Sequence, residues 1–182
     1  MTTQVVVVGS GYAGAGAVKA FEDEVGEGEA ELTWISEHDY HLVLHEVHRA
    51  IRNPGVTDKI TIPVEEIMSP ESDFVEGRVV DVDTEERVVE TDDGTTVDYD
   101  YLLLGVGSTT AFFGIDGLKE HAHQLKSLDD AKAIHEDVRS AAAAATRSDP
   151  VEVIVGGAGL PGIQTAGELS EYRDMHRAPL NI

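Results

Sequence analysis

Two glycine-rich turns carry the chemistry that this sequence shows most plainly. The first is Gly9-Ser10-Gly11-Tyr12-Ala13-Gly14, after Val5–Val8, and the second is Gly157-Ala158-Gly159-Leu160-Pro161-Gly162, after Val153–Val155. Each fits G-x-G-x-x-G between an apolar strand and a helix, where the glycines make a tight turn and let a pyrophosphate approach the backbone. The exposed N–H groups of the first helical turn then attract the diphosphate. The sequence therefore predicts two dinucleotide sites.

An acidic residue near the end of the second strand supports the first site. Glu37, or else Asp39, stands where a carboxylate accepts hydrogen bonds from a ribose. The second motif contains Pro161, which lacks a backbone N–H but suits the first turn of a helix. The sequence to Ile182 does not reach the corresponding ribose-binding residue of the second site, so the choice between NADH and NADPH stays open.

Four histidines form another group of residues that can do chemistry: His38, His41, His45 and His48. Two of their spacings are helical, and the run from His45 to His48 faintly resembles a zinc-binding motif. It departs from H-E-x-x-H because the second histidine comes three residues after the first and no third ligand is evident. We therefore expect no metal here, and histidines that line a pocket or face solvent.

The elements that position these residues follow from the hydrophobic periodicity. Apolar runs predict buried strands at residues 4–8 and 101–104. Leu32, Trp34 and Ile35 mark a further strand that ends near Ser36, and residues 151–155 begin a new βα unit. Helices are expected over residues 12–24, 42–51 and 127–145, with a loop at 27–29, and residues 58–68 fit no single pattern. From residue 74 to 99 the period changes to two, which predicts a three-stranded antiparallel meander. The expected fold is α/β, with a parallel sheet, flanking helices and an inserted β-meander.

The composition narrows the function classes. The 182 residues include 35 Asp and Glu against 13 Lys and Arg, which gives a formal net charge of −22. Such a surface repels nucleic acid and anionic lipid, so neither is expected as a partner. Because cations screen self-repulsion, this acidic protein is expected to be halophilic and to fold fully only in high salt. No apolar run approaches the roughly 20 residues of a membrane-spanning helix, and we expect no signal peptide.

The order of these segments resembles the two-dinucleotide-binding flavoproteins of the pyridine nucleotide-disulfide reductase superfamily. Tyr99–Ser108 is similar to the signature Y-D-x-L-(I/V)-x-A-T-G-S of that superfamily, with Gly105-Val106-Gly107 in place of Ala-Thr-Gly. The resemblance covers nearly the whole chain. It implies a Rossmann-like FAD/NAD(P)-binding fold in which the first loop binds FAD and the second binds NADH or NADPH as co-substrate.

Within that superfamily the chain looks most like type II NADH dehydrogenase. Asp39–Leu42 resembles the segment that approaches the flavin, and Gly159–Leu169 resembles the NADH-loop sequence G-x-x-G-V-E-x-A-G-E-L, with Gln164 in place of a frequent Glu. Thioredoxin- and glutathione-reductase-like enzymes pass electrons through a cysteine pair, whereas this sequence contains no cysteine. The resemblance therefore implies an FAD-dependent oxidoreductase in which NADH gives a hydride to the flavin and two electrons pass directly to a quinone.

The resemblance also implies roles for individual residues. The first glycine loop would hold the FAD diphosphate and Glu37 the ribose, while Val80 would meet the adenine through its backbone. Hydride transfer needs no general acid or base, so no catalytic pair is named. The expected cofactor-binding residues are Gly9, Ser10, Gly11, Tyr12, Ala13, Gly14, Glu37, His38, Val80, Gly105, Gly107, Gly157, Gly159 and Gly162.

The same resemblance suggests how the chain is divided. Residues 1–118 would form the first segment of an FAD-binding domain, with the meander at about 74–99. Residues 119–182 would form a connecting helix and the opening βα unit of an incomplete NAD(P)H-binding domain. The sequence would then be the N-terminal half, roughly, of a longer enzyme. That enzyme is expected in the cytoplasm or peripherally on the inner face of the membrane, through a region outside these residues, and a homodimer stays open.

Three alternatives remain at this point. The chain could be a flavin- or nucleotide-binding fragment without turnover. It could also belong to another FAD/NAD(P) reductase with a different electron acceptor. A third reading is an NAD(P)-only dehydrogenase that uses the first loop.

Overall fold

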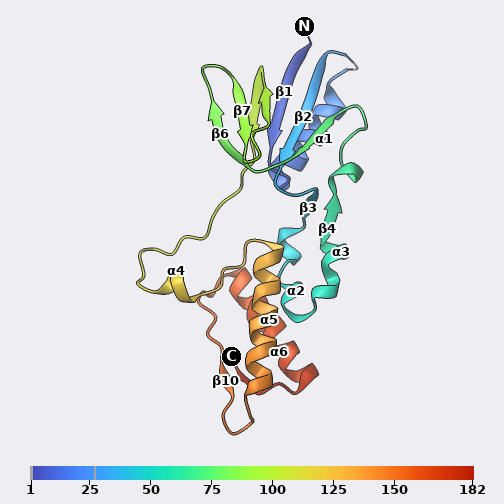
Figure 1. The fold of residues 1–182 in the computed structure, drawn as a ribbon. Helices are drawn as coiled ribbons and strands as arrows, with labels where there is room; N and C mark the ends of the chain where they lie inside the picture. Colours follow the sequence, from blue (N-terminus) through green and yellow to red (C-terminus); the bar gives the residue numbers. More distant parts are fainter. Residues whose placement is uncertain (1, 27) are drawn as a thin grey trace. The chain divides into compact units, whose positions relative to one another are not determined.

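A computed structural model describes residues 2–26 and 28–182, so that Met1 and Glu27, the first residue of the loop expected at 27–29, lie outside it. The chain forms two compact units (Figure 1). The first unit comprises residues 1–42 and 61–108, and the second comprises residues 43–60 and 109–182.

The first unit is built on a parallel sheet of four strands in the order β5-β2-β1-β9. These strands are β1 (Thr3–Val8), β2 (Ala30–Ser36), β5 (Asp73–Glu76) and β9 (Tyr101–Leu104). Val8, near the end of β1, lies opposite Ile35 and Leu104. Because the strands run the same way, the turns that follow β1, β2 and β9 all leave from one edge of the sheet.

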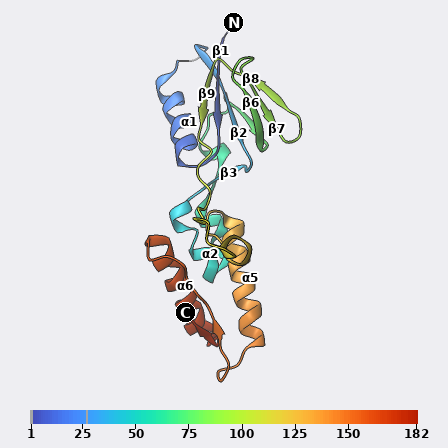
Figure 2. The same cartoon turned by 90° about the vertical axis from the view of Figure 1, so that its left-hand side faces the viewer.

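Alternation along β1 gives the sheet two different faces. Val7 packs with Trp34 and with Val18 of helix α1 (Tyr12–Glu24). Val6 and Val8 pack instead with Val89 of the antiparallel meander. Figure 2 shows α1 and the meander on opposite sides of the sheet. The expected α/β architecture is confirmed, with a helix on one face and the inserted meander on the other.

The meander itself is shorter than the periodicity indicates. It contains β6 (Val79–Asp83), β7 (Val88–Thr91) and β8 (Thr96–Asp98), paired antiparallel. The preceding residues, which were expected to open the meander at 74, form β5 in the parallel sheet. Phe74 lies opposite Trp34 in the ladder, and the two rings meet edge to face at 6.3 Å. A period of two describes both strand types, so alternation alone does not separate them.

The turn between β7 and β8 follows the sequence signal Asp92-Asp93-Gly94. The carboxylate of Asp93 accepts hydrogen bonds from the Thr91 hydroxyl at 2.6 Å and from the Thr95 N–H at 2.9 Å. These donors, the Thr91 hydroxyl first, hold the pKa of the exposed Asp93 carboxyl below its usual value of 3.8. The charged form of Asp93 therefore supports this turn throughout the physiological range.

After β3 (Tyr40–Leu42), residues 43–60 belong to the second unit, and the chain returns to the first unit at β4 (Thr61–Pro63). β4 pairs antiparallel with β3 and is followed by the 3-10 turn η3 (Val64–Glu66). The helix expected over 42–51 is therefore formed only in part. Leu42 is in a strand, η1 (Leu44–Glu46) is a 3-10 turn, and only α2 (Arg49–Arg52) is α-helical. Pairing of β3 with β4 overrides the local helical spacing. The expected stop at Asn53-Pro54-Gly55 is confirmed, because the Asn53 side chain accepts from the Gly55 N–H at 3.0 Å.

The second unit is mainly helical. Its two longer helices are α5 (Leu128–Ala144) and α6 (Leu160–His176). Its shorter helical elements are η2 (Pro54–Val56), α3 (Thr57–Ile60) and α4 (Leu118–His121). The strands β10 (Val151–Glu152) and β11 (Leu180–Asn181) form a parallel pair. The cap expected for α5 is confirmed, because the Ser127 hydroxyl accepts from the Asp130 N–H at 3.0 Å and the Asp130 carboxylate accepts from the Ser127 N–H at 2.9 Å. In the described part of the chain, no helix has the length and apolar character to span a membrane.

The strand at residues 101–104, which was expected to be buried, is largely exposed. Leu104 in β9 is 56% exposed, because among the described residues β9 pairs only with β1 and forms a sheet edge. Likewise β10 covers only Val151–Glu152 rather than 151–155, and Ile154 is 92% exposed. An apolar run predicts a strand that can be buried, but burial also requires a neighbour on each side.

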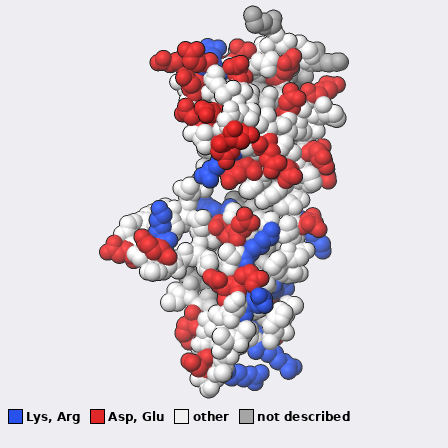
Figure 3. Space-filling model, in the orientation of Figure 1, with Lys and Arg blue, Asp and Glu red and all other residues white. Residues whose placement is uncertain are grey.

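Charge is distributed very unevenly between the two units. The first unit contains 22 of the 35 Asp and Glu but only three of the 13 Lys and Arg, so it carries −19 of the formal −22. Figure 3 shows carboxylates crowded over this unit. Asp81 and Glu90 even lie directly opposite each other in the β6–β7 ladder. Like charges in that position destabilise a sheet by about 0.2–1 kcal/mol.

We expect the first unit to need salt for folding more than the second does. Trp34 is the only tryptophan in the sequence and is fully buried in the first unit, so its emission reports that unit. Raising KCl from dilute buffer to molar concentration should shift its emission to the blue, because cations screen the −19. The substitution Asp81→Asn should lower the salt concentration at the midpoint. A native emission spectrum in dilute buffer would contradict this expectation.

Candidate functional site

The first glycine loop joins β1 to α1 and is held in place by hydrogen bonds to β2, one of them from the side chain of Trp34. Gly9 has a φ of +96°, which favours glycine, and its N–H donates to the Ile35 carbonyl at 2.7 Å. Its own carbonyl accepts from the indole Nε1 of Trp34 at 3.0 Å. The turn out of β1 is therefore fixed by β2, the neighbouring strand.

The same turn leaves no room for a side chain at Gly14 and little room at Gly105. A Cβ on Gly14 would overlap the Gly9 carbonyl oxygen, so α1 packs against the turn through bare backbone. A Cβ on Gly105, just after β9, would lie 3.0 Å from the Val8 carbonyl and 3.1 Å from the Gly14 nitrogen. Gly105 thus packs under the first loop, at the sheet edge where a flavin site was predicted.

Gly11 differs from both, because it faces open space. No atom lies within 4 Å of the position that its Cβ would take. Gly11 is also the N-cap of α1, which has neither a side-chain cap nor an acidic residue in its first turn. An uncapped helix N-terminus beside a bare backbone is suited to an anion. The first loop therefore fits the diphosphate of a dinucleotide.

Ser10 is held by residues of two neighbouring strands, β2 and β3. Its hydroxyl donates to the Tyr40 carbonyl at 2.8 Å and accepts from the Ser36 hydroxyl at 2.9 Å. Its carbonyl lies 2.7 Å from Nδ1 of His41. The ring of His41 in turn meets the ring of Tyr12 edge to face at 4.8 Å. The sequence analysis did not single out Trp34, Ser36 or this role of His41, because these contacts join residues far apart in the chain.

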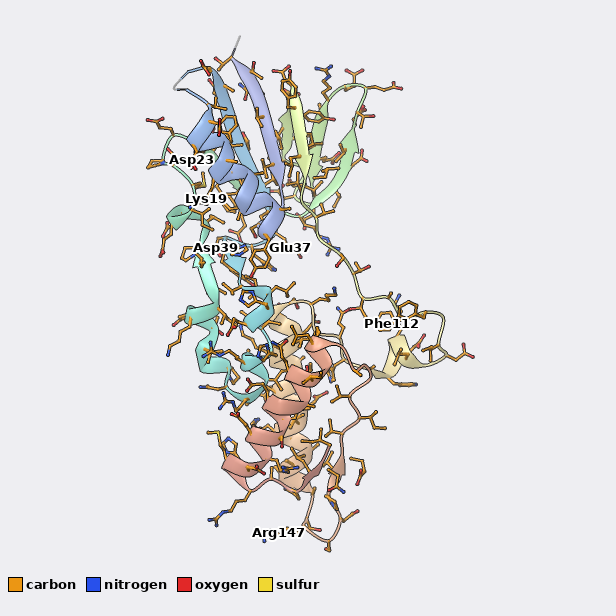
Figure 4. All side chains as sticks on the ribbon, turned by 180° about the vertical axis from the view of Figure 1, so that it is seen from behind. Lys19, Asp23, Glu37, Asp39, Phe112 and Arg147 are labelled. Atoms are coloured by element: carbon orange, nitrogen blue, oxygen red, sulfur yellow. The ribbon has the colours of Figure 1, made fainter. Side chains whose placement is uncertain are left out.

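The predicted ribose-binding acid lies at the carboxyl edge of the sheet. Glu37 follows β2 directly, and Figure 4 shows Glu37 and Asp39 near the end of this strand. The Glu37 carboxylate is 57% exposed and lies 3.9 Å from the guanidinium of Arg78. Beside it, the ring of His38 stacks on that of Tyr40 at 5.0 Å. Glu37 is therefore accessible to a ligand in the first unit, as the prediction requires.

Two further predicted contacts also lie in the first unit. Val80 is the extra residue of a bulge in β6, because Val79 pairs with Thr91 and Asp81 with Glu90. It is 58% exposed, and bulges commonly present backbone for purposes other than sheet pairing. Gly107 follows β9 with a φ of +69° and open space at its Cβ position.

The second glycine loop repeats the geometry of the first. Its N-cap, Gly159, has φ −75° and ψ 173°, close to the −71° and −175° of Gly11. A Cβ on Gly162 would overlap the Gly157 carbonyl oxygen, as Gly14 would overlap Gly9. Pro161 lies in the first turn of α6, as expected. This loop therefore also fits a diphosphate, and it lies in the second unit.

An ion-pair network holds α6 against α2 within the second unit. Arg52 contacts the carboxylate of Glu168 through Nε at 2.6 Å and that of Glu171 through a terminal nitrogen at 2.6 Å. His48 lies 3.9 Å from Glu168, and both side chains are largely buried. The network anchors the face of α6 that lies one turn beyond Gln164.

The four histidines are divided between the two units. His38 and His41 belong to the first unit, whereas His45 and His48 belong to the second. Within residues 2–26 and 28–182, no group of three or more histidine, aspartate or glutamate side chains is placed to hold a metal ion. His41 and His48 each contact protein groups instead.

Comparison with known proteins shows the family to which this sequence belongs. The sequence matches the pyridine nucleotide-disulphide oxidoreductases over residues 3–177. The chain belongs to this family. It is 30% identical over 174 residues to the type II NADH:quinone oxidoreductase of Staphylococcus aureus, a match that covers 92% of this chain and 43% of the relative. The chain thus spans less than half the length of that curated relative.

Solved structures confirm the Rossmann-like fold of this chain. NDH2 from Plasmodium falciparum has a TM-score of 0.79 at 18% identity, covering 97% of this chain and 38% of that one. The sulfide:quinone oxidoreductase of Aquifex aeolicus has a TM-score of 0.74 at 19% identity, covering 98% of this chain and 42% of that one. At such identities the likeness concerns the fold alone.

The glycine at position 14 is expected to have a structural role. Gly14→Ala should lower the free energy of unfolding by about 3 kcal/mol, because the new methyl group must displace the Gly9 carbonyl. Gly16→Ala is the matched control in the same helix, where a Cβ meets nothing within 4 Å, and should raise stability by roughly 0.5–1 kcal/mol. Urea unfolding in high salt, followed by Trp34 emission, measures both. Equal effects at the two positions would contradict the packing described.

The glycine at position 11 is expected to act on binding instead. Gly11→Ala should leave the free energy of unfolding within about 0.5 kcal/mol of wild type, because its φ of −71° and its open surroundings accept alanine. It should weaken FAD binding by on the order of tenfold, the cost of one methyl group in a close contact. Flavin fluorescence titration checks this. Unchanged FAD affinity would exclude Gly11 from the diphosphate site.

Proposed function

We propose that the intact protein is an FAD-dependent oxidoreductase that oxidises NADH and reduces a quinone. The observation that carries this proposal is the first glycine loop, with its open Gly11, uncapped helix and accessible Glu37. Family membership and the 30% identity to a type II NADH:quinone oxidoreductase support it. When bound, a flavin accepts the hydride of NADH and delivers two electrons to quinone, which also takes up two protons.

The chain's own residues supply binding and orientation in this proposal. The first loop would hold the FAD diphosphate through the N–H groups at the start of α1, and Glu37 would accept from the ribose. The second loop would hold the diphosphate of NADH or NADPH at the start of α6. The ion pairs of Arg52 with Glu168 and Glu171 would keep α6 in place.

We assign residues 1–118 to the FAD-binding part and residues 119–182 to the opening of the NAD(P)H-binding part. The two compact units follow this assignment except at residues 43–60 and 109–118, which group with the second unit. A lipid-soluble acceptor would place the intact protein in the cytoplasm at the inner face of the membrane. The absence of cysteine from these residues supports direct reduction of the acceptor rather than a disulfide relay.

The visible spectrum of the purified intact protein tests the proposal. We expect a flavin absorption band that NADH bleaches under anaerobic conditions. A quinone analogue should restore the band, whereas a disulfide substrate should not. Restoration by a different acceptor would keep the flavoenzyme and replace the quinone. A band that NADH fails to bleach would support flavin binding without turnover. A colourless protein that cannot be loaded with FAD would defeat the proposal.

A further inference from the structure

We propose that His41 is a positioning residue that sets the orientation of the Ser10–Gly11 peptide in the first glycine loop. The inference rests on the proposed FAD site, to which it adds a residue outside the glycine motif. His41 is only 6% exposed, and its Nδ1 lies 2.7 Å from the Ser10 carbonyl oxygen. The buried imidazole is therefore within hydrogen-bond distance of the loop backbone.

The contact fixes the tautomer of the imidazole. A carbonyl oxygen can only accept a hydrogen bond, so Nδ1 of His41 must carry the proton. This holds for both the neutral and the protonated ring, since Nδ1–H is present in each.

The hydrogen bond also decides which way the next N–H points. In a trans peptide the C=O of Ser10 and the N–H of Gly11 lie in one plane and point in opposite directions. Because His41 holds the carbonyl on one side, the Gly11 N–H is directed to the other. No atom lies near the vacant Cβ position of Gly11, which makes that residue the approachable part of the loop. The orientation imposed by His41 thus offers a donor, rather than a carbonyl oxygen, to an incoming diphosphate.

A glycine at position 11 makes such a restraint necessary. Glycine adopts positive φ as readily as negative φ, so a flip of the Ser10–Gly11 peptide meets little steric resistance. A flipped peptide would present an oxygen to an anion and repel it. Gly11 therefore lets the diphosphate approach, but it does not by itself fix the orientation of the Ser10–Gly11 peptide.

His41 is itself rigidly supported. It lies in β3, where it pairs with Ile62 of β4, and its ring meets the ring of Tyr12 edge to face. The preceding residue, Tyr40, accepts the Ser10 hydroxyl at 2.8 Å. The hydroxyl and the carbonyl of Ser10 are therefore bound to adjacent residues of one short strand, which makes β3 a fixed support for the loop.

Two substitutions of His41 separate this role from simple packing. Asparagine places its side-chain N–H near the position of Nδ1, so His41→Asn should keep FAD affinity within about threefold of wild type. His41→Phe keeps a ring but leaves the Ser10 carbonyl without its donor, and should weaken FAD binding about tenfold or more. His45→Phe is the control, because the His45 side chain is 65% exposed and lies outside the loop. FAD binding is measured by flavin fluorescence on the intact protein in high salt.

A second measurement tests the geometry without any cofactor. Nitrogen-15 NMR of the unliganded wild-type protein should show His41 with its proton on Nδ1. A proton on Nε2 alone, a Phe variant that binds FAD like wild type, or an Asn variant as weak as the Phe variant would each overturn the inference. Failure of NADH or quinone turnover would affect only the proposed function, because neither FAD affinity nor the tautomer depends on turnover.

Discussion

The structure of the first unit depends on one close contact between backbone atoms. Helix α1 begins so near the end of β1 that a Cβ on Gly14 would overlap the carbonyl oxygen of Gly9. This approach brings the helix N-terminus to the edge of the sheet, next to the ends of β2 and β9. The same contact recurs between Gly162 and Gly157 in the second unit. Both candidate dinucleotide sites thus rest on the absence of one methyl group.

Much of this arrangement could be predicted because it is local. The two glycine motifs, the bounds of α1 and the cap of α5 each depend on residues within a few positions of one another. The errors concern elements whose state is decided at long range. β5 is parallel because it pairs with β2, and Leu42 is in a strand because β3 pairs with β4. β9 is exposed because, among the described residues, it is an edge strand. His41 shows the same limit, since only the fold brings it to Ser10.

The negative charge of the first unit opposes the binding of an anion at the proposed flavin site. The first unit carries −19, yet the proposed ligand is a diphosphate. Only three Lys or Arg belong to this unit, and one of them, Arg78, lies beside Glu37. Within this unit, we therefore expect the attraction to come from oriented N–H groups of the loop and α1 rather than from side-chain cations. High salt would favour binding by screening the surrounding carboxylates.

We propose that the first loop holds the FAD diphosphate through backbone N–H groups. The decisive measurement is the set of amide chemical shifts recorded while nitrogen-15-labelled protein is titrated with FAD. We expect the N–H signals of Gly11 and of the first turn of α1 to shift with FAD, and those at the start of α6 to shift with NADH instead. Shifts with FAD at the second loop, or none at the first, would contradict it.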